Sequence, residues 1–179
     1  MNVRMASVDE YQFLRCLKYG VWGSNQRRID KWNIGDMLIF SIDKKITALA
    51  EVTGAIYETD ELLWDNGIYM YRLPLKFKVV LSVEDRIPVV GDIKDYLVLS
   101  WGFNYGTGIV NKRLLNEEAA KFIVEKIEDK PNSLLFFLDN IDRLIQDVNY
   151  ERELEFKKQE DPYYAKSQKK YKNKQFDLE

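Results

Sequence analysis

The sequence has no histidine and only one cysteine, Cys16, among its 179 residues. Metal sites built from histidine and cysteine, a disulfide within the chain, and catalysis by a histidine base are therefore excluded. Long apolar runs are also missing, since runs such as LLFFL at 134–138 are far shorter than the roughly 20 residues that a membrane helix requires. The N-terminus lacks the apolar core of a secretory signal. These absences predict a cytoplasmic protein that does not enter a membrane.

The sequence also has no excess of either charge, because 27 basic residues face 29 acidic ones and leave a net charge of −2. Such a balance does not produce the general basic surface of many nucleic-acid-binding proteins. Binding of that kind would need a local basic patch and stacking on aromatic rings. Rings are plentiful, at 13% of residues, and a hydrophobic content of 46% is ample for the core of one domain.

No group of residues forms a recognisable catalytic constellation. The carboxylate pairs at 9–10, 60–61 and 84–85 fall in turns or at helix starts, where solvated caps explain them. Cys16 falls within the first predicted helix, where a small buried thiol is expected rather than a nucleophile. The glycine-rich stretch 102–108, expected to be a loop, lacks the pattern of a phosphate-binding loop. We therefore expect a protein that is not an enzyme and uses no cofactor.

The apolar periodicity predicts an α+β domain with mostly antiparallel links between strands. Strands are predicted at 2–6, 37–42, 46–57, 68–81 and 96–101, and helices at 8–18, at about 117–128 and from 133 onward. Ser7 is the expected N-cap of the first helix, with Glu10 as its capping-box partner, and Asn116 is the expected N-cap of the second. This order suggests a small curved sheet or open barrel that carries helices on its outside.

Three parts are predicted along the chain: a domain at 1–130, a C-terminal helix at 131–149 packed on that domain, and a charged tail or linker at 150–179. Apolar residues between 134 and 148 keep helical spacing, so this helix is expected to pack on something. The tail is polar, and its segment 166–174 holds five lysines and no acidic residue. That composition is typical of a tail or of a linker toward a further domain.

An aromatic and basic feature stands out in the stretch KYGVWGSNQRRID at 18–30. Trp22 is expected there on a glycine-flanked turn, and Trp64 in another polar connection between strands. Indoles held in this way can stack on a nucleobase. The basic residues that follow Trp22, namely Arg27, Arg28 and Lys31, could hold the flanking phosphates. The alternative is that both indoles fill the core and the cations are simply solvated.

Several motifs in this order resemble those of the EVE and YTH domains of the PUA-like superfamily. They are YGVWGS at 19–24, GDMLIFS at 35–41 and YMYR at 69–72, and the helix near 115–127 falls where these families have their late helix. The resemblance covers roughly residues 2–128. It implies an α+β fold with a small curved β-barrel and outer helices, which reads a modified base in single-stranded or flipped form.

The resemblance also implies a base-binding pocket. In YTH domains a cage of aromatic walls holds N6-methyladenine, and here Trp22 matches the first wall and Trp64 is the best match for the second. Tyr69 or Tyr57 could stand in for a third wall. Gln12 falls where YTH domains direct an asparagine or aspartate toward a ring nitrogen of the base.

The remaining residues of the expected site lie around that pocket. Ser24 belongs to the YGVWGS motif and is assigned to the base-binding pocket. Lys112 and Arg113 match a basic phosphate contact of the family. Met70 stands where the EVE strand usually has proline.

The partner implied by the resemblance is nucleic acid, with DNA favoured over RNA. Domains of this kind resemble the N-terminal specificity modules of McrBC-type restriction systems, which recognise modified DNA and precede an AAA+ GTPase motor. We therefore expect a target-recognition domain, with such a GTPase domain possible downstream in the same polypeptide. Two alternatives stay open: an RNA-binding PUA-like domain, for N6-methyladenine or unmodified RNA, and a protein-interaction module that uses the helix at 133–149.

Overall fold

The computed structural model describes residues 1–160. The chain divides into two units, residues 1–141 and a unit that begins at Asp142, and each is described by itself. The lysine-rich segment at 166–174 lies outside the described residues.

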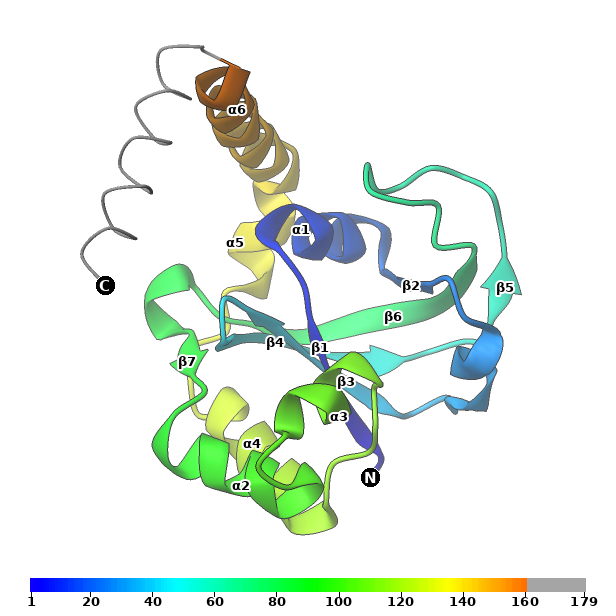
Figure 1. The fold of residues 1–179 in the computed structure, drawn as a ribbon, viewed down its shortest axis with the longest axis vertical. Helices are drawn as coiled ribbons and strands as arrows, with labels where there is room; N and C mark the ends of the chain where they lie inside the picture. The colour runs from blue at the N-terminus through cyan, green and yellow to red at the C-terminus, as the bar shows by residue number, and fades with distance from the viewer. Residues whose placement is uncertain (161–179) are drawn as a thin grey trace, which may run out of the picture. The chain divides into compact units, whose positions relative to one another are not determined.

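The first unit is built on a mixed sheet that curls into a half-barrel (Figure 1). Its strands are β1 (Val3–Ser7), β2 (Val21–Ser24), β3 (Met37–Ile42), β4 (Lys45–Val52), β5 (Tyr57–Glu58), β6 (Tyr71–Val80) and β7 (Ile87–Pro88). The strand order is β1-β3-β4-β6-β2, with β5 on β6 and β7 on β4. Only the β1–β3 pair is parallel among these described strands. The long strand β6 pairs with β4 through its second half and with β2 and β5 through its first half, so it links the two parts of the sheet.

Helices cover both faces of this sheet (Figure 1). They are α1 (Glu10–Tyr19), α2 (Gly91–Trp101), α3 (Tyr105–Val110), α4 (Glu117–Glu128) and α5 (Leu134–Asp139), with short 3-10 turns η1 (Arg27–Lys31) and η2 (Val83–Asp85). Neighbouring residues of a strand point to opposite faces. In β3, Ile39 accordingly joins the core with α2 and α4, and Phe40 packs on the other face, with its ring centroid 5.7 Å from that of Phe13 in α1.

The ends of two helices were assigned from sequence with different success. Asn116 caps α4 as predicted, since its side chain accepts from the backbone N–H groups of Glu118 and Ala119. The first helix was predicted, but its cap was assigned wrongly, because Asp9 is the N-cap and Gln12 its capping-box partner. Ser7 remains the last residue of β1, which continues its pairing with β3 up to that position.

Two predictions between residues 96 and 108 were also wrong. The stretch 96–101 belongs to α2 and is not a strand, and the expected loop 102–108 contains most of α3. A short apolar run does not distinguish a buried strand from a helix by periodicity alone. The structure resolves the ambiguity because Ile93 and Leu97, spaced by four residues, are buried together in the core under α4.

The stretch predicted as one helix from 133 onward is two helices that are separated at Asn140. In the first unit, α5 is anchored to β6, since the Ser133 N–H donates to the Val80 carbonyl at 2.7 Å. In the second unit, α6 (Ile141–Glu160) continues beyond residue 150, where the tail was predicted to begin. The three-part division of the chain stays a prediction. None of the helices within residues 1–160 combines the length and the apolar composition needed to cross a membrane.

Candidate functional site

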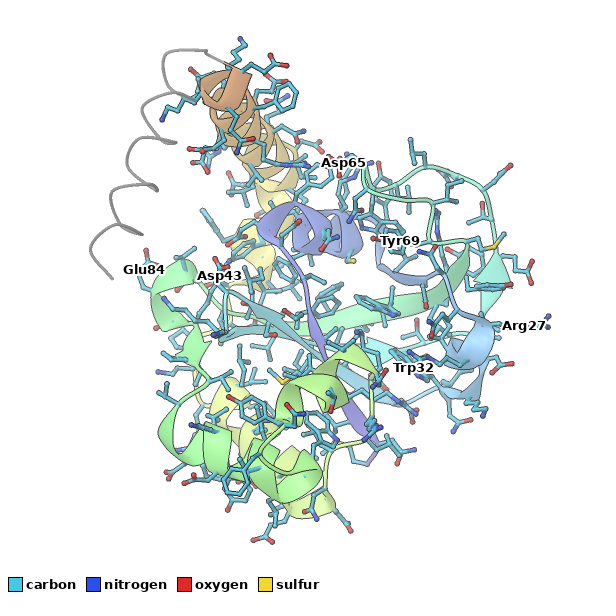
Figure 2. All side chains as sticks on the ribbon, viewed as in Figure 1. Arg27, Trp32, Asp43, Asp65, Tyr69 and Glu84 are labelled. Atoms are coloured by element: carbon cyan, nitrogen blue, oxygen red, sulfur yellow. The ribbon has the colours of Figure 1, made fainter. Side chains whose placement is uncertain are left out.

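A cavity of about 580 Å³ lies where α1, β2, η1 and the residues after α3 meet. Eight of the ten residues assigned to the site from sequence line it: Gln12, Trp22, Ser24, Arg28, Lys31, Trp64, Tyr69 and Lys112. The other two, Arg27 and Arg113, are exposed and do not belong to the described lining. Figure 2 shows Arg27 pointing outward from η1, while Trp32 lies inside the domain. Tyr57, considered as a third wall, is likewise not among the described lining residues.

The first aromatic wall, Trp22, is held by the regular strand β2 and not by the turn that was predicted there. Trp22 pairs with Leu73 of β6, and β2 begins directly after Gly20, whose left-handed backbone ends α1. The Trp22 ring meets Phe40 edge to face, with 5.9 Å between centroids. Trp22 is half-buried and lines the cavity, while its Nε1 is buried and has no hydrogen-bond partner among the described residues.

The second indole, Trp64, is packed much more tightly and is only 4% exposed. The Arg72 guanidinium carbon lies 5.1 Å from the centre of its ring, and Tyr69 meets the ring edge to face at 5.5 Å. A Cβ placed on Gly23 would come within 2.6 Å of Trp64 Cη2, so only glycine allows this approach to β2. Trp64 therefore contributes a buried edge of the cavity, and Trp22 offers the more accessible indole.

A third tryptophan, Trp32, also lines the cavity and was not assigned to the site from sequence. The guanidinium carbon of Arg4, in β1, lies 4.8 Å from the centre of its ring. Arg4 in turn forms a buried ion pair with Asp36 at 2.8 Å, and Asp36 also accepts from the Asn33 N–H at 3.0 Å. The available signal was the place of Trp32 directly after the basic stretch 27–31. The contact with Arg4 joins residues far apart in the chain, so sequence spacing does not reveal it.

The polar side of the cavity comes from α1. Gln12 lines the cavity while its Oε1 accepts from the Asp9 N–H at 3.1 Å as part of the helix cap. The cap therefore uses the acceptor of this amide and leaves the NH₂ group as its donor. Cys16, one helical turn further, is buried. Burial raises the pKa of the Cys16 thiol to about 12, against a hydrogen bond with the Trp64 side chain that lowers it, so the thiol stays protonated near neutral pH.

Positive charge gathers at this cavity although the whole chain carries a net charge of −2. The described lining contains four basic side chains, Arg4, Arg28, Lys31 and Lys112, and no acidic one. The Lys112 Nζ donates to the carbonyls of Ile109 and Val110, each at 3.2 Å, and lies 5.6 Å from the centre of the Trp22 ring. Partial burial, and then the charge of Arg28, lower the pKa of Lys112. Cations brought together in this way favour an anionic ligand next to the Trp22 ring.

No protein-family model and no curated protein sequence matches the chain. Solved structures do match it. The YTH domain of the Zygosaccharomyces rouxii MRB1 protein, in complex with N6-methyladenosine RNA, has a TM-score of 0.51 at 14% identity, over 74% of this chain and 90% of that one. The apo YTH domain of Toxoplasma CPSF4 has a TM-score of 0.52 at 8% identity, over 73% and 88%.

A protein from Rhodopseudomonas palustris has a TM-score of 0.50 at 12% identity, over 72% of this chain and 94% of that one. At such identities the likeness concerns the fold alone. It confirms the predicted α+β class. This chain therefore has the curled half-barrel fold of the YTH domains that match it.

Proposed function

We propose that this protein is a nucleic-acid-binding module that accepts a modified base, in single-stranded or flipped form, into the cavity beside Trp22. The main observation behind the proposal is that one cavity joins the half-buried indole of Trp22 to three basic side chains, Arg28, Lys31 and Lys112. The fourth basic residue, Arg4, is already paired with Asp36, and the described lining contains no acidic residue. The complex of the Zygosaccharomyces rouxii YTH domain with N6-methyladenosine RNA supports it, because that domain has the same fold.

The chemistry of the cavity suits such a ligand. A base stacked on an aromatic ring contributes about 1–3 kcal/mol to binding. A methylated amine loses its hydration more easily than an unmodified one and gains contact with the rings. Arg28, Lys31 and Lys112 line the same cavity, and we expect them to attract the phosphates next to that base. Flipping a paired base costs a few kcal/mol, which these contacts must offset.

We further propose that the polymer is DNA. The protein would then be the target-recognition domain of a modification-dependent restriction system, with an AAA+ GTPase as its partner. This finer proposal depends on the motif resemblance to specificity modules of the McrBC type. Reading of RNA is the second candidate, and the N6-methyladenosine RNA bound to a YTH domain of the same fold favours it.

The test compares four labelled single-stranded oligonucleotides of one sequence, DNA or RNA, each with adenine or N6-methyladenine at the centre. We expect the wild-type protein to bind the modified strand of one polymer at least about tenfold more tightly than its unmodified twin, a difference of about 1.4 kcal/mol. Fluorescence anisotropy titrations at two salt concentrations measure the dissociation constants of the four strands. Equal affinity within both pairs, with a steep salt dependence, would instead indicate a general binder of unmodified strands.

A further inference from the structure

Arg72 of β6 is a charged side chain that is only 1% exposed. Arg72 is not among the described residues that line the cavity. A buried cation is costly unless its donors are satisfied. The groups that satisfy Arg72 all belong to the segment that carries Trp64 and Tyr69.

Arg72 gathers carbonyl groups from both sides of Trp64. Its Nη2 donates to the carbonyl of Glu61 and, at 3.0 Å, to that of Ile68. Its Nε donates to the Tyr69 carbonyl at 3.3 Å. The segment 59–70 is irregular, without helix or strand, so these carbonyls have no ladder of their own. The Arg72 guanidinium therefore connects the two ends of this segment, whose Leu63 carbonyl also accepts from the Arg15 Nε at 2.6 Å.

The same guanidinium supports the two aromatic side chains. It lies over the Trp64 ring, 5.1 Å from its centre. It also holds the carbonyl of Tyr69, whose φ of 50° is in the left-handed region that a bulky residue rarely adopts. Such conformations persist where surrounding contacts impose them, and they cluster at functional sites. Tyr69 then meets Trp64 edge to face and lines the cavity.

We propose that Arg72 is a positioning residue of the base cavity, which pre-forms the wall made by Trp64 and Tyr69 before a ligand arrives. The inference depends on the proposed function for its effect on binding, but not for its effect on the segment 61–69. A planar fork of donors suits several carbonyls at once, whereas the ammonium of lysine is a single point charge on a flexible stem. Replacement by lysine therefore keeps the charge and removes the fork.

Arg86 provides a control, because its side chain is also buried but forms its ion pair elsewhere in the domain. Its side chain is 6% exposed and pairs with Glu10 of α1, and its Nε and Nη2 have no hydrogen-bond partner within residues 1–160. It is not among the described residues lining the cavity. Arg72→Lys and Arg86→Lys are both expected to lower the melting temperature, so stability alone does not distinguish positioning from a plain structural role.

Two measurements make that distinction. The first is hydrogen exchange of the backbone amides at 61–70 in the free protein, corrected for global stability. We expect exchange at least tenfold faster in Arg72→Lys than in the wild type or Arg86→Lys. The second is the dissociation constant for the oligonucleotide that the wild type binds best. We expect this dissociation constant to rise in Arg72→Lys, because a smaller fraction of the protein then has the segment closed. The rise should equal the fold decrease in that closed fraction. The dissociation constant should stay unchanged in Arg86→Lys.

Exchange at 61–70 that is no faster in Arg72→Lys than in Arg86→Lys overturns the proposal, whatever the protein binds. Faster exchange with an unchanged dissociation constant also overturns it, because the wall would then not matter for binding. If the wild type distinguishes none of the oligonucleotides, the proposed function fails, while the exchange result still decides whether Arg72 holds the segment. Should Arg72→Lys not fold, Arg72→Gln, which keeps an amide donor, takes its place in both measurements.

Discussion

The two indoles that were predicted for this cavity, Trp22 and Trp64, are held in place by different kinds of contact. Trp22 lies on a strand, where main-chain pairing with β6 sets its position. Trp64 lies in an irregular segment whose carbonyls are held by Arg72 and, at Leu63, by the Arg15 Nε at 2.6 Å. The strand leaves Trp22 half-buried, whereas the side-chain contacts around Trp64 bury it almost completely.

The difference teaches that the same residue type serves one site in two roles. A side chain on a paired strand can stay partly exposed, because main-chain hydrogen bonds already order its backbone. A side chain on an irregular segment must help to order the segment through its own packing. Trp22 is therefore expected to make the direct stacking contact, and Trp64 to shape the cavity from behind.

The largest effect on binding affinity is expected when the Trp22 ring is removed. Trp22→Ala should weaken binding of the preferred modified strand by about 5- to 150-fold, which corresponds to the roughly 1–3 kcal/mol of a stacked base. Anisotropy titrations with modified and unmodified strands would measure it. Trp22→Phe, which keeps a smaller ring, is the control and should recover part of the loss. An unchanged affinity in Trp22→Ala would assign the stacking role elsewhere in the cavity.

A smaller effect on binding affinity is expected when the buried ring of Trp64 is displaced. In Gly23→Ala, the new Cβ would lie 2.6 Å from Trp64 Cη2, so the ring must shift. Overpacking of this kind costs about 1–3 kcal/mol, shared between stability and binding, so we expect a loss of affinity of roughly tenfold or less. Gly106→Ala, where nothing lies within 4 Å of the added atom, is the matched control and should bind normally. Similar affinities for both variants would show that the exact place of Trp64 is unimportant.

The smallest effect on binding affinity is expected when Gln12, on the polar side of the cavity, is replaced. Gln12→Glu keeps the acceptor that caps α1 and replaces the NH₂ donor by a carboxylate oxygen. Loss of one hydrogen bond to an acceptor on the base should weaken binding about 2- to 12-fold, for a net worth of about 0.5–1.5 kcal/mol. The melting temperature should stay near that of the wild type. Equal binding by Gln12→Glu would mean that this amide does not read the base.

Residues that were assigned from sequence through a short motif line the cavity, although their role in binding stays a prediction. Trp22 and Ser24 were assigned through a short motif, and both line the cavity from β2. Assignments by proximity in sequence were less reliable, since Arg28 lines the cavity and its neighbour Arg27 points away. In a 3-10 turn such as η1, adjacent side chains face different directions, so a run of basic residues does not all reach one ligand.

The sequence by itself determined the elements whose signal is local: the apolar pattern of β3, the Asn116 cap of α4, and the exclusion of chemistry that needs histidine. The tertiary structure alone decided that Arg72 turns inward behind Trp64, that Arg4 lies on Trp32, and that Lys112 reaches the ring of Trp22. Periodicity and caps act between near neighbours in the chain. The placement of a charge beside a ring depends on how the sheet curls, and that brings together residues from distant parts of the chain.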